Sequence, residues 1–305
     1  MPHSLLSRTA IDSLIQRALS EDAASRDATS RAVIPATTRI RARLLAKAPG
    51  VLAGGPLAAQ VFRVVDPSLH CKLRARDGAT LIRGQTIVTV EGRARSIFAA
   101  ERTALNLLGH LSGIATLTRR YVEAVRGSRA QVFDTRKTLP GLRLLEKYAV
   151  QLGGGQNHRA NLADAVLIKT NHLRAIRNQQ SAISTGLATA VEKARKRTRR
   201  KFVEVEVTNL RELKAALAAR PDAILLDNWR VTDIRKAVKL RNALPRPAGR
   251  NRRGGHASRF TKLEVSGGVT LANVRAIAKT GADRISVGRL THSAPSLDVS
   301  LKVLS

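Results

Sequence analysis

From residue 130 onwards the chain alternates short apolar runs with longer amphipathic stretches. Six runs have the composition of buried strands: "AQVFD" (130–134), "AVLIK" (165–169), "FVEVEV" (202–207), "AILLD" (223–227), "LEVSG" (263–267) and "RISVG" (284–288). Helical patterns lie between most of them, near 142–151, 182–197, 209–219, 230–243 and 270–280. Strands that alternate with helices form a parallel sheet with helical crossovers. Because six strands fall short of a closed barrel of about eight, the sequence predicts an incomplete parallel α/β barrel.

The predicted strands end in polar or glycine residues: Asp134, Lys169, Glu206, Asp227, Ser266 and Gly288. In a barrel of parallel strands these positions gather at one mouth, where active sites lie. The motifs GxGxxG and GxxxxGK[ST] follow none of these strands, which argues against a Rossmann or P-loop nucleotide site.

The N-terminal part has a mixed α and β pattern. Helices are predicted at 9–20, 56–66 and 96–125, and strands at 39–54, 70–78 and 86–92. The tail "APSLDVSLKVLS" places apolar residues at alternate positions from Leu297 to Val303, which predicts a strand with one buried face. We expect this strand to complete the N-terminal sheet. The predicted domains are therefore 1–125 plus 291–305, and 126–290.

The chain is strongly basic, with 54 Lys and Arg against 22 Asp and Glu and a formal net charge of +32. Such a field attracts nucleic acid, anionic membranes and phosphorylated metabolites. The runs "KARKRTRRK" (193–201) and "RPAGRNRRGGHASRFTK" (246–262) account for less than half of the excess. Aromatic residues that could stack on bases make up 3% of the chain and do not interleave with the cations, which favours a general compositional bias.

The same composition favours a soluble protein of the cytoplasm. No apolar run approaches the roughly 20 residues of a membrane span. Cys71 is the single cysteine, which excludes an intramolecular disulfide and a cysteine metal cage.

Charged residues at the strand ends form a candidate anion site. The cations are Arg136, Lys137, His158, Arg159 and Lys169, and the acids are Glu206 and Asp227. Arginines bind carboxylates through paired hydrogen bonds, and two carboxylates suit Mg²⁺ or ribose hydroxyls. The glycine turns at 266–268 and 287–288 suit a phosphate, the first of them before a predicted helix. Together they predict transfer at a phosphorylated sugar. Each of these features also has a simpler interpretation when it is taken alone. Cations at strand ends can be solvent-exposed surface residues, a glycine pair can be an ordinary turn, and Glu206 in "VEVEV" could face solvent.

Several longer motifs resemble the quinolinate phosphoribosyltransferase family, also called nicotinate-nucleotide pyrophosphorylase (carboxylating). In chain order they include "ERTALNLLGHLSGIAT", "DTRKTLPGLRLLEKYAV", "GGGQNHRANLADAVLIKTNH", "VEVEVTNLREL", "ILLDNW" and "LEVSGGVTLANVRAIAKTGADRISVG". The resemblance covers nearly the whole chain. It implies conversion of quinolinate and 5-phosphoribosyl 1-diphosphate to nicotinate mononucleotide, pyrophosphate and CO₂, a step of NAD synthesis that requires Mg²⁺. It also implies an N-terminal open-faced α/β sandwich, an incomplete barrel and a homodimer, and leaves open a hexamer built of dimers.

The resemblance also implies roles for residues. Arg136, His158 and Arg159 resemble the quinolinate clamp, and Arg102 resembles an arginine donated across the dimer interface. Lys137 and Lys169 resemble lysines beside the reacting centre, and Glu206 and Asp227 resemble acids near the ribose and the metal. The expected phosphoribosyl contacts are Thr138, Glu206, Asp227, Ser266, Gly267, Gly268, Val287 and Gly288.

The chain departs from the family pattern at three positions. Thr170 replaces an acid beside Lys169, Gln151 replaces a cation, and Val265 replaces an alanine. The first bears on metal affinity or rate.

Two other functions stay open. One is a related phosphoribosyltransferase with another acceptor, like the homologues associated with molybdate-transport operons. The other is a degenerate scaffold that binds nucleic acid through its basic surface, with a salt-sensitive affinity. Weak nonspecific binding of nucleic acid is compatible with all three functions.

Overall fold

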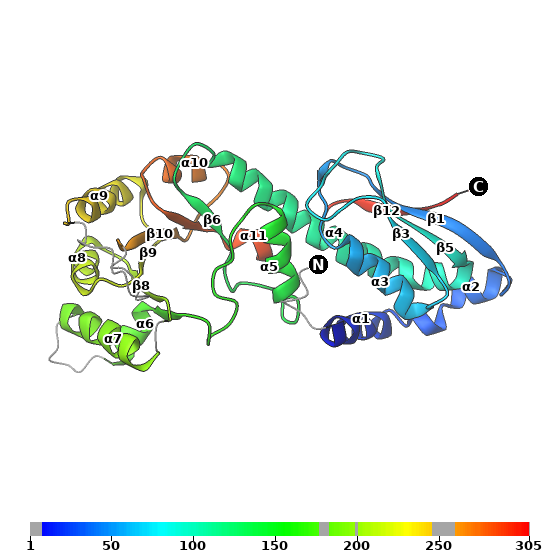
Figure 1. Cartoon of the computed structure of the whole chain (residues 1–305), viewed down its shortest axis with the longest axis horizontal. Coiled ribbons are helices and arrows are strands. Elements are labelled where there is room, and N and C mark those ends of the chain that lie inside the picture. The colour runs from blue at the N-terminus through cyan, green and yellow to red at the C-terminus, as the bar shows by residue number, and fades with distance from the viewer. Residues whose placement is uncertain (1–7, 177–182, 199–200, 246–259, 305) are drawn as a thin grey trace, which may run out of the picture. The chain divides into compact units, whose positions relative to one another are not determined.

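The computed structural model describes residues 8–176, 183–198, 201–245 and 260–304 (Figure 1). Within these ranges the chain forms two compact units. The first contains residues up to 120 together with 137–155 and 290–305, and the second contains 121–136 and 156–289. Residues 199–200 and 246–259, which hold much of the two basic runs, lie outside the described residues.

The first unit contains a four-stranded antiparallel sheet in the order β12-β1-β5-β3. Its strands are β1 (Arg39–Ala46), β3 (His70–Leu73), β5 (Thr86–Arg93) and β12 (Val299–Leu304). The tail pairs with β1, with Leu301 opposite Leu44, so the alternating apolar pattern of the tail does form an edge strand of this sheet.

Besides this sheet, the first unit contains helices. They are α1 (Arg8–Glu21), α2 (Ala28–Val33), α3 (Gly55–Val65), most of α4 (Ala94–Ala124), α5 (Arg143–Leu152) and α11 (Arg289–His292, which begins at the unit boundary), with a 3₁₀ turn at Ala24–Arg26. Ala42, Leu44 and Ala46 of β1 are fully buried, whereas Arg39 and Arg41, at the alternate positions earlier in the strand, are exposed. This alternation is that of an antiparallel sheet covered on one side.

The predicted strand 39–54 is wrong as a single element. It divides into β1 and the short β2 (Gly50–Val51), which pairs with β4 (Thr80–Leu81) in a separate two-stranded sheet. Pro49 precedes β2, and proline has no N–H to donate to a strand ladder, which accounts for the break.

The second unit contains a six-stranded parallel sheet in the order β6-β11-β10-β9-β8-β7. Its strands are β6 (Gln131–Phe133), β7 (Val166–Ile168), β8 (Val203–Val207), β9 (Ala223–Asp227), β10 (Lys262–Ser266) and β11 (Arg284–Ser286). All six strands of the sequence prediction are present, and the incomplete barrel is confirmed.

Helices lie outside these strands (Figure 1). They are α6 (Thr170–Ala175), α7 (Ile183–Arg197), α8 (Leu210–Ala219), α9 (Val231–Asn242) and α10 (Val274–Ala278). The predicted helix 270–280 is shorter in the structure, and α6 has no counterpart in the prediction. In the described residues no helix is long and apolar enough to cross a membrane.

Residues 137–155 lie in the first unit, although the sequence-based division placed them with the barrel. Polar contacts of α5 explain the difference. Glu146, fully buried, lies 2.9 Å from Nε2 of His110 on α4. The Tyr148 hydroxyl donates to Asp77 at 2.8 Å, and Arg119 of α4 donates to the carbonyl of Gly153 at 3.0 Å.

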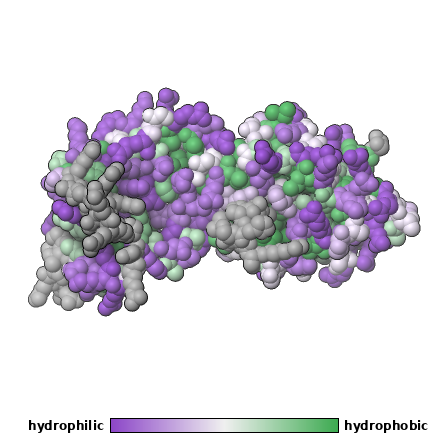
Figure 2. Space-filling model, viewed as in Figure 1, coloured by the Kyte–Doolittle hydropathy of each residue, from purple (hydrophilic) through white to green (hydrophobic). Residues whose placement is uncertain are grey.

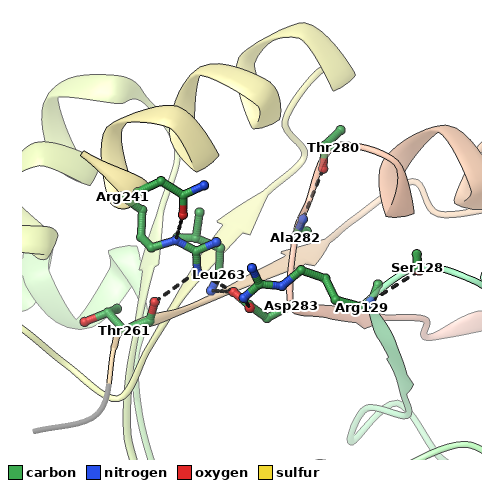
Figure 3. Close-up of polar contacts among 10 residues, drawn as sticks. Ser128, Arg129, Arg241, Thr261, Leu263, Thr280, Ala282 and Asp283 are labelled. Carbon is green, nitrogen blue, oxygen red and sulfur yellow. Dashed lines mark hydrogen bonds and ion pairs between the residues drawn. The ribbon is translucent and has the colours of Figure 1, made fainter. Parts of the chain in front are cut away.

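A charged cluster stabilises the amino-terminal end of the barrel strands (Figure 3). Asp283, just before β11, accepts hydrogen bonds from the backbone N–H of Leu263 at 2.9 Å and from the buried guanidinium of Arg241 on α9. Arg129, before β6, pairs with its other oxygen. One carboxylate therefore joins three strands and a helix at the end where barrel residues serve stability.

Candidate functional site

The carboxyl ends of the barrel strands bring most of the predicted site residues of the second unit to one edge. The register places Asp227 beside Ser266, Ile168 beside Val205, and Phe133 beside Ser286. Because parallel strands all end at this edge, Arg136, Lys169, Glu206, Asp227 and Gly288 follow one another around it.

A short segment fills the gap beside β6 and carries two of the predicted cations. The N–H of Gln156 donates to the carbonyl of Val132 at 2.8 Å, and the N–H of Asp134 donates to the carbonyl of Gln156 at 3.1 Å. The segment therefore runs parallel to β6 like an added strand. Next to it, Nη1 of Arg159 donates at 3.1 Å to the carbonyl of Ala165, one residue before β7.

The positive charges of two arginines act on each other at this point. The pKa of Arg159 is lowered, first by burial and next by the positive charge of Arg136, and Glu204 and Asp164 only partly oppose this shift. Like charges held together in a partly desolvated place are costly. A ligand with two carboxylates would offset both positive charges.

Glu206 is held by the residue that replaces the usual acid. Both the backbone N–H and the hydroxyl of Thr170 donate to Oε1 of Glu206, at 3.2 and 3.0 Å. Thr170 is the first residue of α6, and Lys169 before it is exposed. Thr170 therefore orients the Glu206 carboxylate and adds no negative charge of its own.

Thr170→Val removes the hydroxyl and keeps the shape of the side chain. We expect turnover to fall about tenfold, because one hydrogen bond to a charged group contributes about 1.5 kcal/mol or more. Thr170→Ser keeps the hydroxyl and is expected to stay within about twofold. Steady-state assays of the two variants check this, and equal losses in both would contradict it.

The turn after β9 contacts the glycine turn after β10. The N–H of Asn228 donates to the carbonyl of Ser266 at 2.9 Å, and the Asn228 side chain lies over Gly267. Gly267 and Gly268 have φ of 87° and 60°, a region that glycine adopts without strain. Asp227 accepts a hydrogen bond from Nδ2 of Asn228 at 3.2 Å.

The sequence-based expectation of a helix N-terminus at this turn is wrong. The next helix, α10, begins only at Val274. The N–H of Val287 is also engaged, since it donates to the carbonyl of Phe133 at 2.9 Å. The backbone groups that remain as candidate phosphate donors are those of the turn at 266–268, where Gly267 and Gly268 have successive positive φ values.

Three of the predicted site residues belong to the first unit. Arg102 is exposed on α4, and Lys137 is exposed before α5. The carbonyl of Lys137 accepts from the Thr291 hydroxyl at 2.6 Å. Thr138 accepts from Nε of Arg143 at 2.9 Å, which fixes the loop after Lys137.

Sequence reasoning missed three buried charged residues inside the barrel. Glu204 of β8 and Glu264 of β10 are at most 1% exposed, and Arg284 of β11 lies with its Nε 2.9 Å from Oε2 of Glu264. The alternative in which the "VEVEV" acids face solvent is wrong for Glu204. The sequence did contain an indication of these residues: each is a charged residue within a strand that was predicted to be buried on both faces.

Burial raises the pKa of both carboxyls, to about 6 for Glu204 and about 7 for Glu264. The negative charge of Glu204 raises the pKa of Glu264 further, while Arg284 and His158 lower it. Desolvation dominates because a charge inside protein loses its hydration.

The pKa of Glu264 predicts how stability changes with pH. Since the folded protein holds this proton more tightly than the unfolded chain does, with its ordinary pKa of 4.5, the contribution is complete below pH 4.5. It is lost as the pH rises through about 7. Between pH 4.5 and about pH 7, we therefore expect the free energy of unfolding to fall less steeply with rising pH in Glu264→Gln than in the unmodified protein. Urea unfolding across that range checks this, and equal slopes would contradict it.

Comparison with known proteins agrees with this architecture. Residues 27–112 match the family described as "Quinolinate phosphoribosyl transferase, N-terminal domain", and residues 114–302 match its C-terminal domain. The chain belongs to the quinolinate phosphoribosyltransferase family. The resemblance seen in the sequence motifs is thereby confirmed.

Relatives extend over almost the whole chain. A nicotinate-nucleotide pyrophosphorylase [carboxylating] of Mycobacterium leprae is 43% identical over 292 residues, 94% of this chain and 95% of its own. A chloroplastic relative from Arabidopsis thaliana is 38% identical over 96% of this chain and 82% of its own. The solved nicotinate-nucleotide pyrophosphorylase of Francisella tularensis has a TM-score of 0.85 at 37% identity and covers 98% of both chains.

Proposed function

We propose that the protein transfers the phosphoribosyl group of 5-phosphoribosyl 1-diphosphate to quinolinate, releasing pyrophosphate and CO₂ and forming nicotinate mononucleotide. Family membership supports this proposal, since relatives carry the name of that activity. The observation that carries it in this chain is that Arg136 and Arg159 follow two segments that pair side by side, Phe133 with Gln156, so a dianionic acid would offset the repulsion between the two guanidinium charges. Bidentate bonding between guanidinium and carboxylate supplies the geometry.

In the proposed mechanism, Arg136 and Arg159 hold the two carboxylates of quinolinate. Lys137 and Lys169 supply positive charge beside the reacting groups. The pyridine nitrogen attacks the anomeric carbon as the bond to the diphosphate breaks, and the electron pair of that bond leaves with the diphosphate. The ring nitrogen is then positive, which stabilises the electrons left at the 2-position when CO₂ departs. That carbon then takes a proton from water, which gives nicotinate mononucleotide.

The carboxylates and the glycine turns act on the sugar. As the diphosphate leaves, the ribosyl centre gains oxocarbenium character, and the fixed negative charges of Glu206 and Asp227 stabilise it. Ser266, Gly267, Gly268 and Gly288 bind the 5-phosphate through their backbone. Positioning of the two substrates provides a large part of the rate.

We propose Mg²⁺ as the cofactor. Asp227 ends β9, Glu206 is the last residue but one of the adjacent strand β8, and both are partly exposed. Carboxylate oxygens and substrate phosphates are the ligands that Mg²⁺ prefers, so these residues fit the ion. When bound, it would neutralise charge on the departing diphosphate.

We propose a cytoplasmic homodimer in which the partner subunit's Arg102 reaches the quinolinate pocket. Its exposed position on α4 is compatible with such a role. Mixing Arg102→Ala with Lys137→Ala protein tests this. Complementation, with activity rising above that of either variant alone, is expected if active sites are shared, and its absence in a mixture shown to exchange subunits would contradict it.

The direct test supplies quinolinate, 5-phosphoribosyl 1-diphosphate and Mg²⁺ and follows nicotinate mononucleotide by chromatography. Absence of product, with neither substrate bound, would overturn the proposal. Nicotinate serves as a competing acceptor, and phthalate serves as a competing ligand that cannot react. Each lacks one feature of quinolinate, a carboxylate or the ring nitrogen, so preferential use or binding of another acid would favour a different acceptor.

We also propose weak nonspecific binding of nucleic acid, at a basic surface of the first unit. The uncovered face of the antiparallel sheet carries the basic residues Arg39, Arg41, Lys72, Arg93 and Lys302, all exposed. Hydrophilic residues also spread over much of the molecular face in Figure 2. Binding of an RNA oligonucleotide should weaken steeply with salt, and a salt-independent affinity would contradict an electrostatic origin.

A further inference from the structure

His158 uses both of its ring nitrogens within the protein. The backbone N–H of Arg159 donates to Nδ1 of His158 at 2.9 Å, so Nδ1 accepts and the ring proton is on Nε2. Nε2 lies 2.9 Å from Oε2 of Glu204 and 3.5 Å from Oε1 of Glu264. The ring therefore points inward to the buried acids.

The contacts of His158 connect distant parts of the barrel. Its backbone N–H donates at 2.8 Å to Oδ1 of Asp134, which is fully buried directly after β6. Its ring reaches Glu204 on β8, and β6 and β8 are separated by three other strands in the sheet. Residue 158 thus joins opposite sides of the incomplete barrel just before Arg159.

The acids behind His158 are themselves held in place. Glu264 accepts a hydrogen bond from the Ser286 hydroxyl and lies beside Arg284. The Arg284 guanidinium stacks over Phe133 at 3.9 Å and lies 5.2 Å from the centre of the Phe202 ring. Cation–π contacts of this kind fix the guanidinium plane.

A metal ion is a poor alternative occupant of this cluster. His158, Glu204 and Glu264 do offer ligand atoms within 4.8 Å of one another. Arg284 already places a positive charge 2.9 Å from Glu264, and the proton on Nε2 occupies the position through which His158 would bind an ion. The cluster is therefore balanced by the protein's own charges.

We propose that Glu204, supported by Glu264 and Arg284, is a positioning residue for quinolinate binding: it fixes the His158 ring, and His158 in turn fixes the backbone from which Arg159 reaches the carboxylate. His158 is then an internal support and not a substrate ligand, which differs from the role implied by the family resemblance. This inference rests on the proposed function for the identity of the ligand.

The test compares Glu204→Leu, which has no acceptor for Nε2–H, with Glu204→Gln, which keeps one. We expect Glu204→Leu to raise KM for quinolinate about tenfold and to leave KM for 5-phosphoribosyl 1-diphosphate within about twofold, with Glu204→Gln close to the original protein. Glu192→Leu, at an exposed acid on α7, controls for the loss of charge. Equal changes in both KM values, or equal losses in both Glu204 variants, would overturn the proposal.

Nitrogen NMR of labelled histidine, assigned with His158→Gln, provides a readout that does not need turnover. The original protein should show a protonated Nε2 and an unprotonated Nδ1, and added quinolinate should leave both signals in place. Glu204→Leu should keep Nδ1 unprotonated, because the Arg159 N–H still donates to it, and should shift the Nε2 signal, because that N–H loses its acceptor. A large shift of either ring nitrogen when quinolinate binds would overturn the proposal. If the unmodified protein has no activity but shows this single tautomer, the proposed reaction is contradicted and the positioning role of Glu204 is not.

Discussion

Lys137→Ala is expected to lower kcat/KM by about a thousandfold or more, because a charge placed at the reacting groups acts mainly on the transition state. Lys137 follows Arg136 in the loop after β6 and is exposed, and substitutions of exposed residues usually change stability by less than about 0.5 kcal/mol. Its backbone carbonyl keeps the hydrogen bond from Thr291. The thermal midpoint should therefore stay unchanged.

Lys262→Ala is the matched control for Lys137→Ala. Lys262 is also exposed, but it begins β10, at the end of the sheet opposite the site. Both variants lower the net charge by one unit, so a nonspecific electrostatic effect would change both alike. Nearly full activity is expected for Lys262→Ala. A Lys137→Ala protein that keeps a tenth of the original rate would show that this lysine does not act at the reacting centre.

The sequence predicts the barrel well because its strands are short, apolar and bounded by polar residues. "AILLD", for example, becomes β9 with Asp227 at its end. Patterns failed where a single residue or a distant contact decides the structure. Pro49 divides one long alternating run into β1 and β2, and the contacts of α5 with α4 place residues 137–155 in the first unit.

Contacts between distant residues also limit what the sequence predicts about the candidate site. Strand ends could be predicted to meet because that follows from parallel topology. The sequence could not predict that Thr170 donates to Glu206 or that the His158 ring points inward. Both features depend on side chains that meet across the barrel. The roles assigned to the site residues stay predictions, and these two contacts change what is expected of Thr170 and His158.

Gly267→Ala is expected to lower kcat/KM about a hundredfold, mainly through a higher KM for 5-phosphoribosyl 1-diphosphate, since displacement of a binding loop by about 1 Å can cost that much. A Cβ on Gly267 would lie 2.2 Å from Oδ1 of Asn228 and 3.0 Å from its backbone nitrogen. The turn after β10 must therefore move away from the turn after β9. That movement displaces the backbone groups proposed to bind the 5-phosphate.

The Gly127→Ala variant distinguishes the effect of the collision with Asn228 from the effect of backbone strain alone. Gly127 has φ of 81°, close to the 87° of Gly267, but nothing lies within 4 Å of its added Cβ. It should lose stability to a similar strain and keep its KM values. Asn228→Gly in the Gly267→Ala background removes the colliding side chain, so it should recover part of the lost affinity for the phosphoribosyl substrate. If Gly127→Ala raises the same KM as Gly267→Ala, the effect is general strain, and the glycine turn at 266–268 is not the phosphate site.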